Sequence, residues 1–107
     1  MLLCIYGNAD ITTFEGAKKA CEDGIGEGCH NLGVRYVNGQ GVEQNQQKAN
    51  EFFGKACDSG IAGGCYNLGL IYINGRGVKE SYTKASEFFG KACDGGNAKG
   101  CEKYPLF

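Results

Sequence analysis

Cysteine is the residue type whose number and spacing most clearly allow chemistry in this chain. The 107 residues include seven cysteines, and six of them form three C-x7-C pairs: Cys21 with Cys29, Cys57 with Cys65, and Cys93 with Cys101. Paired cysteines form disulfides or bind zinc. Zinc sites typically show C-x2-C spacing, and a tetrahedral site would need two of these pairs to converge. The spacing therefore favours disulfides, and we expect no metal ligands and no cofactor.

A second candidate chemistry is nucleophilic catalysis at Ser81, which stands in an S-x-x-K motif with Lys84. The S-D-N and K-T-G motifs that accompany S-x-x-K in serine β-lactamases are absent. Asn45 stands 36 residues before Ser81, and both residue types cap helix N-termini. His30, the single histidine, aligns with Tyr66 in the same way, which predicts a tolerant surface position and not a general base. We therefore assign no catalytic residue.

Charge and hydropathy limit the partners and the location. Eleven Lys and Arg against twelve Asp and Glu give a formal net charge of −1, so no basic footprint for nucleic acid is present. No apolar stretch reaches the ~20 residues that a membrane-spanning helix needs. Residues 1–6 lack the basic start and the length of a signal peptide. Because disulfides persist in oxidising compartments, we expect a periplasmic or secreted protein whose natural leader has been removed.

The cysteines belong to an internal repeat of 36 residues. Residues 21–56 and 57–92 agree at 21 of 36 positions, which is enough to identify tandem structural units. A third unit begins at Cys93 and stops at Pro105, because proline cannot continue a helix interior. Upstream, residues 13–20 match the last part of a further unit.

Each repeat contains two amphipathic helices. Apolar residues follow a helical stripe over residues 49–57, repeated at 85–93, and we call this helix B. A second stripe over residues 29–36, repeated at 65–72, defines helix A. The turn from A to B is Asn-Gly-x-Gly-Val in both repeats, and its glycines supply the positive φ of a helix end.

The C-x7-C pair joins the end of one helix B to the start of the next helix A. On one continuous helix its cysteines would lie ~12 Å apart, whereas a disulfide needs Cα atoms ~4.4–6.8 Å apart. The helix must therefore break, and we expect Gly24 and Gly28, with their equivalents in the other repeats, to provide the break. Gly33 and Gly69 lie inside the helix A stripe and predict the close approach of a neighbouring helix.

These observations predict an all-α fold in a single domain. The architecture is an α/α superhelix (solenoid) of about two and a half 36-residue helix-turn-helix repeats, stapled by disulfides. The expected segments are 1–12 (N-terminal cap or degenerate repeat), 13–20 (partial repeat), 21–56 and 57–92 (repeats), and 93–107 (C-terminal partial repeat).

Candidate binding residues are those of helix A that fall off the apolar stripe: Asn31, Arg35, Asn67 and Ile71. They would face the inner side of the superhelix, where solenoids bind extended peptides. Asparagine suits a peptide backbone because its amide both donates and accepts. The alternative is that Asn31 and Asn67 form hydrogen bonds within the fold. Arg35 and Ile71 differ between the repeats, as a surface specific for one partner would.

The repeat carries several short motifs in fixed order. They are Lys55-Ala56-Cys57, Gly64-Cys65, Asn67-Leu68-Gly69, Tyr72, Gly75-Arg76-Gly77-Val78 and Lys84-Ala85-x-x-Phe88-Phe89. With the period of 36 and C-x7-C, residues 13–104 resemble the Sel1-like repeats, relatives of the tetratricopeptide repeats. More narrowly, they resemble the disulfide-rich branch of that family, the Helicobacter cysteine-rich proteins.

The resemblance implies a right-handed superhelix with one disulfide per repeat in an exported protein. It implies a protein-interaction scaffold, the role of most members of the wider repeat family. It also implies an alternative, because members of that branch have been described as penicillin-binding proteins or weak β-lactamases. This chain departs from the family in having fewer repeats than its members usually carry.

Cys4 lies outside the 36-residue period and leaves an odd thiol. Its apolar neighbours could cover the end of the helix at residues 13–23, where the preceding helix A is missing. They could equally pair with a second chain and form a homodimer through Cys4. We expect the intramolecular cap, because local burial costs less entropy than association.

Overall fold

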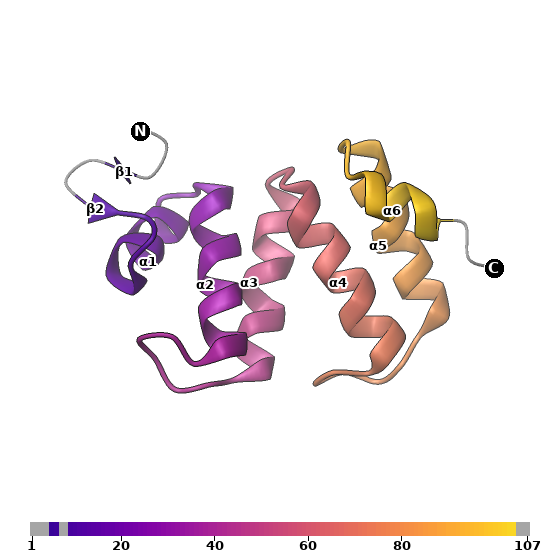
Figure 1. Cartoon of the computed structure of the whole chain (residues 1–107), viewed down its shortest axis with the longest axis horizontal. Coiled ribbons are helices and arrows are strands. Elements are labelled where there is room, and N and C mark those ends of the chain that lie inside the picture. The colour runs from indigo at the N-terminus through magenta and orange to yellow at the C-terminus, as the bar shows by residue number, and fades with distance from the viewer. Residues whose placement is uncertain (1–4, 7–8, 105–107) are drawn as a thin grey trace.

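Helices in antiparallel pairs follow one another along the long axis of the molecule (Figure 1). The computed structural model describes residues 5–6 and 9–104, and its dimensions are 45 × 28 × 18 Å. The described helices are α1 (Phe14–Glu22), α2 (Gly26–Asn38), α3 (Gln46–Asp58), α4 (Ala62–Asn74), α5 (Tyr82–Asp94) and α6 (Ala98–Lys103). In the nomenclature above, α2, α4 and α6 are A helices, and α1, α3 and α5 are B helices. The all-helical repeat fold is confirmed.

The N-terminal segment adds an element that the repeat does not predict. Strands β1 (Ile5–Tyr6) and β2 (Ala9–Asp10) pair antiparallel, with Ile5 opposite Asp10, and both strands contact α1. Cys4 lies outside the described residues.

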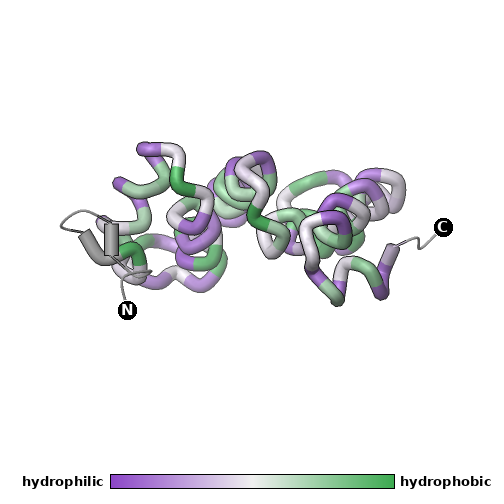
Figure 2. Tube along the Cα trace, turned by 90° about the horizontal axis from the view of Figure 1, so that it is seen from above, coloured by the Kyte–Doolittle hydropathy of each residue, from purple (hydrophilic) through white to green (hydrophobic). Residues whose placement is uncertain are grey.

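The start of each B helix is determined by a side-chain cap. Thr13, Asn45 and Ser81 have extended backbones, and each side-chain oxygen accepts a hydrogen bond from the backbone N–H three residues later. This bond satisfies one of the donors that a helix N-terminus leaves unpaired. The A helices α2 and α4 end at Gly39 and Gly75, whose φ angles of 68° and 65° are left-handed. Figure 2 shows hydrophilic and hydrophobic residues intermixed along the coiled trace.

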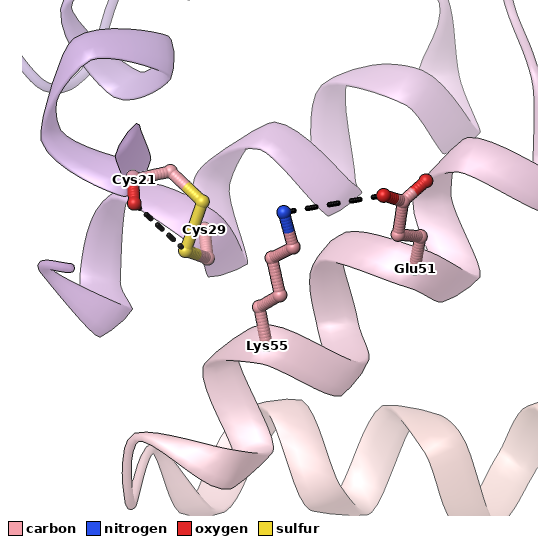
Figure 3. The surroundings of a disulfide bond; sticks show 4 residues. All are labelled: Cys21, Cys29, Glu51 and Lys55. Atoms are coloured by element: carbon pink, nitrogen blue, oxygen red, sulfur yellow. Dashed lines mark hydrogen bonds and ion pairs between the residues drawn. A yellow bond between two sulfur atoms is a disulfide. The ribbon is translucent and has the colours of Figure 1, made fainter. Parts of the chain in front are cut away.

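The three predicted disulfides are present. Cys21 and Cys29, Cys57 and Cys65, and Cys93 and Cys101 have Cα–Cα separations of 4.5, 4.6 and 4.4 Å. Figure 3 shows the first bridge between the end of α1 and the start of α2, with Lys55 and Glu51 of α3 nearby. The two upstream bridges are buried in the core, whereas Cys101 of the third is exposed. Sulfurs bonded in this way are not available to bind zinc.

The two glycines of each disulfide turn have different roles. Gly24, Gly60 and Gly96 take positive φ angles of 87°, 91° and 95°, so they make the predicted break. Gly28 does not, which corrects its expected role: a Cβ there would lie 2.6 Å from the Cβ of Ala20. The second glycine of the pair therefore allows two helix ends to pack closely, and it does not turn the chain.

Glycines inside the A helices allow the repeats to interlock. A Cβ on Gly33 would lie 2.7 Å from the ring of Phe53, and one on Gly69 would lie 2.4 Å from the ring of Phe89. Phe53 and Phe89 are 3% and 0% exposed, so each ring fills the space that a glycine leaves. The close approach predicted for these glycines is confirmed.

Candidate functional site

Two neighbouring hollows lie along the face formed by α2 and α4, which we call the helix A face. The N-terminal hollow, of about 160 Å³, is lined by Thr12, Asn31, Val34, Arg35 and Gln40. The α2–α4 hollow, of about 190 Å³, is lined by Val34, Val37, Asn38, Gln46, Phe53, Asn67, Leu70, Ile71 and Arg76. Val34 belongs to both. The four residues predicted from the sequence therefore fall into two adjoining hollows, two in each.

In the N-terminal hollow, both predicted residues bind the chain's own N-terminal segment. Asn31 Nδ2 donates to the carbonyl oxygen of Ile11 at 3.0 Å. Arg35 donates from Nη2 to the carbonyl oxygen of Thr12 and from Nη1 to that of Gln40. This segment lies where a preceding helix A would lie in a longer array, so Asn31 and Arg35 fasten it to α2.

Asn67 makes the equivalent bond between two repeats. Its Nδ2 lies 3.2 Å from Nε2 of His30 on α2, and the His30 ring packs 5.6 Å from the ring of Phe53. The amides of Asn31 and Asn67 thus both form hydrogen bonds within the fold, which was the alternative to peptide binding. In each residue Oδ1 has no partner among the described residues and stays available as an acceptor.

His30 is not the exposed position that its alignment with Tyr66 suggested. The imidazole is half-buried between α2 and α4, and this desolvation lowers its pKa from the ordinary value of 6.5. Tyr66 packs against Phe89 with ring centroids 5.7 Å apart, much as His30 packs against Phe53. The two residues are therefore equivalent in packing as well as in sequence.

Ile71 also differs from its expected place on the surface. It is only 4% exposed and belongs to the core cluster that contains Leu68. Its position therefore places it at the bottom of the α2–α4 hollow and not on an exposed face. The half-buried Leu70, the next residue before it, is the more accessible apolar group.

The α2–α4 hollow combines an apolar lining with one available cation. Val34, Val37 and Leu70 contribute half-buried aliphatic surface. Arg76 is exposed, and its guanidinium has no hydrogen-bond or ion-pair partner in the described part of the chain. Among the described lining residues of the two hollows there is no carboxylate. The arrangement can hold an apolar side chain together with an anionic group.

Ser81 has the capping role expected of it. Its Oγ accepts a hydrogen bond from the backbone N–H of Lys84 at 3.1 Å. The Lys84 ammonium lies over the ring of Tyr72, 5.7 Å from its centroid. Within residues 5–6 and 9–104 no cluster of three metal-ligating side chains occurs. None of the described helices is both long enough and apolar enough to cross a membrane.

One repeated feature was not singled out from the sequence. Tyr36 stacks on Phe52 with centroids 5.7 Å apart, and Lys48 and Lys55 lie over these two rings. The same four-residue arrangement recurs 36 residues later in Tyr72, Phe88, Lys84 and Lys91. The signal was present, because all four residue types are identical between the repeats.

The repeated helix pair, the glycine-bearing turns and the disulfide at each junction together define a disulfide-stapled helical repeat protein. The chain belongs to the Sel1 repeat family, whose sequence profile matches residues 26–61 and 62–97. Each matched unit begins with an A helix, so the profile starts five residues later than the units counted from the cysteines, with the same period. Comparison with curated proteins gives no match.

Solved structures give the same result. Helicobacter pylori cysteine rich protein B superposes with a TM-score of 0.81 at 37% identity, over 83% of this chain and 67% of that one. A Sel1 repeat protein from Oxalobacter formigenes has a TM-score of 0.78 at 25% identity, over 81% of this chain. A protective antigen of uropathogenic Escherichia coli has a TM-score of 0.76 at 32% identity, over 80% of this chain. This chain covers 35% and 18% of the last two proteins.

Proposed function

We propose that this protein is a scaffold that binds an extended peptide segment of another protein on the helix A face. The observation that carries the proposal is the α2–α4 hollow, which is lined by aliphatic side chains and Arg76. Among the described residues the Arg76 guanidinium has no partner, and no carboxylate lines this hollow. Oδ1 of Asn31 and of Asn67 remains available to accept backbone N–H groups. Membership of the Sel1 repeat family, which typically serves protein interaction, supports a binding role.

We also propose that the protein is exported from the cytoplasm. Three disulfides in one small domain are typical of an oxidising compartment, and a similar arrangement of repeats occurs in the Helicobacter pylori cysteine rich protein. We infer a periplasmic or secreted scaffold. Fractionation of the source cells, followed by mass spectrometry of the oxidised chain, tests this location.

A peptide-library selection on the oxidised protein tests the binding function. Selected peptides should shift the backbone amide resonances of α2 and α4. Leu70→Gln should weaken the affinity for these peptides at least about tenfold, because it removes apolar contact. Glu87→Gln, on the exposed surface of α5, is the matched control and should leave binding unchanged. Peptides that shift only other helices, or that bind Leu70→Gln equally well, would contradict the proposal.

Penicillin binding or weak β-lactamase activity, the alternative raised by the family resemblance, has no supporting arrangement among the described residues. Ser81 accepts its bond from a backbone N–H, and the Lys84 ammonium lies over an aromatic ring. A nitrocefin assay on the oxidised protein separates the two functions. Turnover above background that requires the folded chain would favour the enzyme.

A further inference from the structure

A third hollow lies between two B helices and shares no lining residue with the two hollows of the helix A face. This α3–α5 cleft has a volume of about 460 Å³. Its α3 wall includes Glu51, Gly54 and Asp58, and its floor includes Leu68, Tyr72 and Phe88.

Gly54 lines the cleft and leaves open space where a side chain would stand. This glycine lies in the middle of a 13-residue helix, where glycine is less favourable than alanine. Gly33 and Gly69 leave room for phenylalanine rings, but a Cβ on Gly54 would have no atom within 4 Å. Packing within the chain therefore gives no reason for glycine at this position.

The preceding repeat has an equivalent but smaller cleft. Between α1 and α3 the equivalent cleft has a volume of about 180 Å³, and Lys18 occupies the position of Gly54. Glu22 occupies the position of Asp58, and the floor is again formed by a leucine, a tyrosine and a phenylalanine. The first cleft is thus lined by an exposed lysine and an exposed carboxylate, where the second cleft has a glycine and a carboxylate.

Carboxylates on the α3 wall of the cleft complement a basic side chain, while two ammonium groups already lie over the rings of its floor. Glu51 and Asp58 line the cleft, and none of its described lining residues is basic. The Asp58 carboxylate has no partner in the described part of the chain, and Glu51 has only an exposed contact of 3.9 Å with Lys55. Exposed pairs of this kind contribute little and exchange readily. Lys84 and Lys91 stand 5.7 and 5.4 Å from the ring centroids of Tyr72 and Phe88.

We propose that the α3–α5 cleft binds a lysine or arginine side chain of a partner protein. The alkyl stem lies on Leu68, Tyr72 and Phe88, and the charged head lies between Glu51 and Asp58. Long basic side chains combine apolar stem and charged tip in this way. This site is separate from the peptide site on the helix A face, so the two can bind different parts of one partner.

A matched pair of peptides tests the proposal on the full oxidised chain by amide NMR. The first is a blocked pentapeptide of four glycines around one arginine, and the second carries citrulline, which has nearly the same shape without the charge. The arginine peptide should shift resonances of α3 and α5 near Gly54 and bind at least about tenfold more tightly than the citrulline peptide. Equal binding of the two peptides, or shifts confined to α2 and α4, would overturn the proposal.

Two substitutions exchange the residues that the two clefts carry at this equivalent position. Gly54→Lys copies Lys18 and should abolish binding of the arginine peptide, because the new ammonium fills the cleft. Lys18→Gly copies Gly54 and should create a second binding position between α1 and α3. Circular dichroism establishes that both variants are folded. Undiminished binding to a folded Gly54→Lys variant would show that the cleft is not the site.

Discussion

At the scale of single residues, substitution of Ser81 distinguishes a helix-capping role from a catalytic role. Because its Oγ accepts the Lys84 backbone N–H, Ser81→Ala should lower the free energy of unfolding by about 0.5–2 kcal/mol. Ser81→Asn copies the cap of the preceding repeat, Asn45, and should retain stability. Urea denaturation measures both variants. A folded Ser81→Ala protein that loses β-lactam turnover shown by the wild type would instead identify a nucleophile.

His30 should make the stability of the protein depend on pH. Burial lowers the pKa of His30 in the folded state, so the unfolded chain binds the proton more tightly. The stability contributed by the neutral ring is complete above the unfolded pKa of about 6.5 and is lost as the pH falls through the lower, folded pKa. Protonation of Nε2 also removes the acceptor for Asn67.

The control for this pH dependence is a variant that carries, at position 30, the residue found at the equivalent position of the next repeat. His30→Tyr copies Tyr66, which packs on Phe89 as His30 packs on Phe53. Thermal melting between about pH 7.5 and 5 should show a smaller loss of stability in this variant than in the wild type. An identical loss in the two proteins would assign the pH dependence to the carboxylates.

Repeat alignment was sufficient to predict the cap at Ser81, because the cap is a local contact over three residues. It was insufficient for Asn31 and Asn67, whose partners lie on other elements: the Ile11 carbonyl and the His30 ring. Ile71 was misplaced for a related reason. Its burial depends on how α4 packs in the core, which helical periodicity alone does not determine.

At the scale of elements, the disulfides should differ in what they stabilise. Cys57 and Cys65 are 7% and 4% exposed at the junction of α3 and α4. Replacing both with alanine should cost about 2–5 kcal/mol, because loop entropy and core packing are lost together. The same replacement of Cys93 and Cys101 should cost less, since Cys101 is exposed. Equal costs, measured by urea denaturation under oxidising conditions, would show that packing around the bridge is unimportant.

Substitution by alanine should have opposite effects on stability at two glycines inside the helices. Gly54→Ala should raise the free energy of unfolding by about 0.5–1 kcal/mol, because it improves helix propensity and meets no atom within 4 Å. Gly69→Ala should destabilise the fold, because its Cβ would lie 2.4 Å from the buried ring of Phe89. Thermal melting measures both. A destabilised Gly54→Ala variant would mean that the α3 helix needs glycine for its own packing.

At the scale of the whole molecule, the repeat explains why so much of the architecture was predictable. The turn, the cystine spacing and the helix stripes recur with one period, so an assignment in one repeat is checked by the other. The paired strands β1 and β2 occur once and outside that period. Both strands contact α1, so this part of the fold depends on contacts that the other repeats do not duplicate.

The association state follows from how this N-terminal end is covered. The carbonyls of Ile11 and Thr12 are bonded to Asn31 and Arg35, and β1 and β2 contact α1, so the apolar end of the stack is covered by the chain itself. A two-fold contact through this end would have to break those bonds, and association adds its own entropy cost. We therefore expect a monomer, with Cys4 as a free thiol.

Size-exclusion chromatography with light scattering checks this expectation. The wild type and Cys4→Ser should elute as monomers of about 11 kDa with or without reductant mild enough to spare the buried bridges. Asn31→Ala loosens the N-terminal segment by removing the donor to Ile11, so it should increase the reaction of Cys4 with a thiol reagent. A wild-type dimer that disappears both on reduction and in Cys4→Ser would instead show that the end of the stack is an interface between two chains.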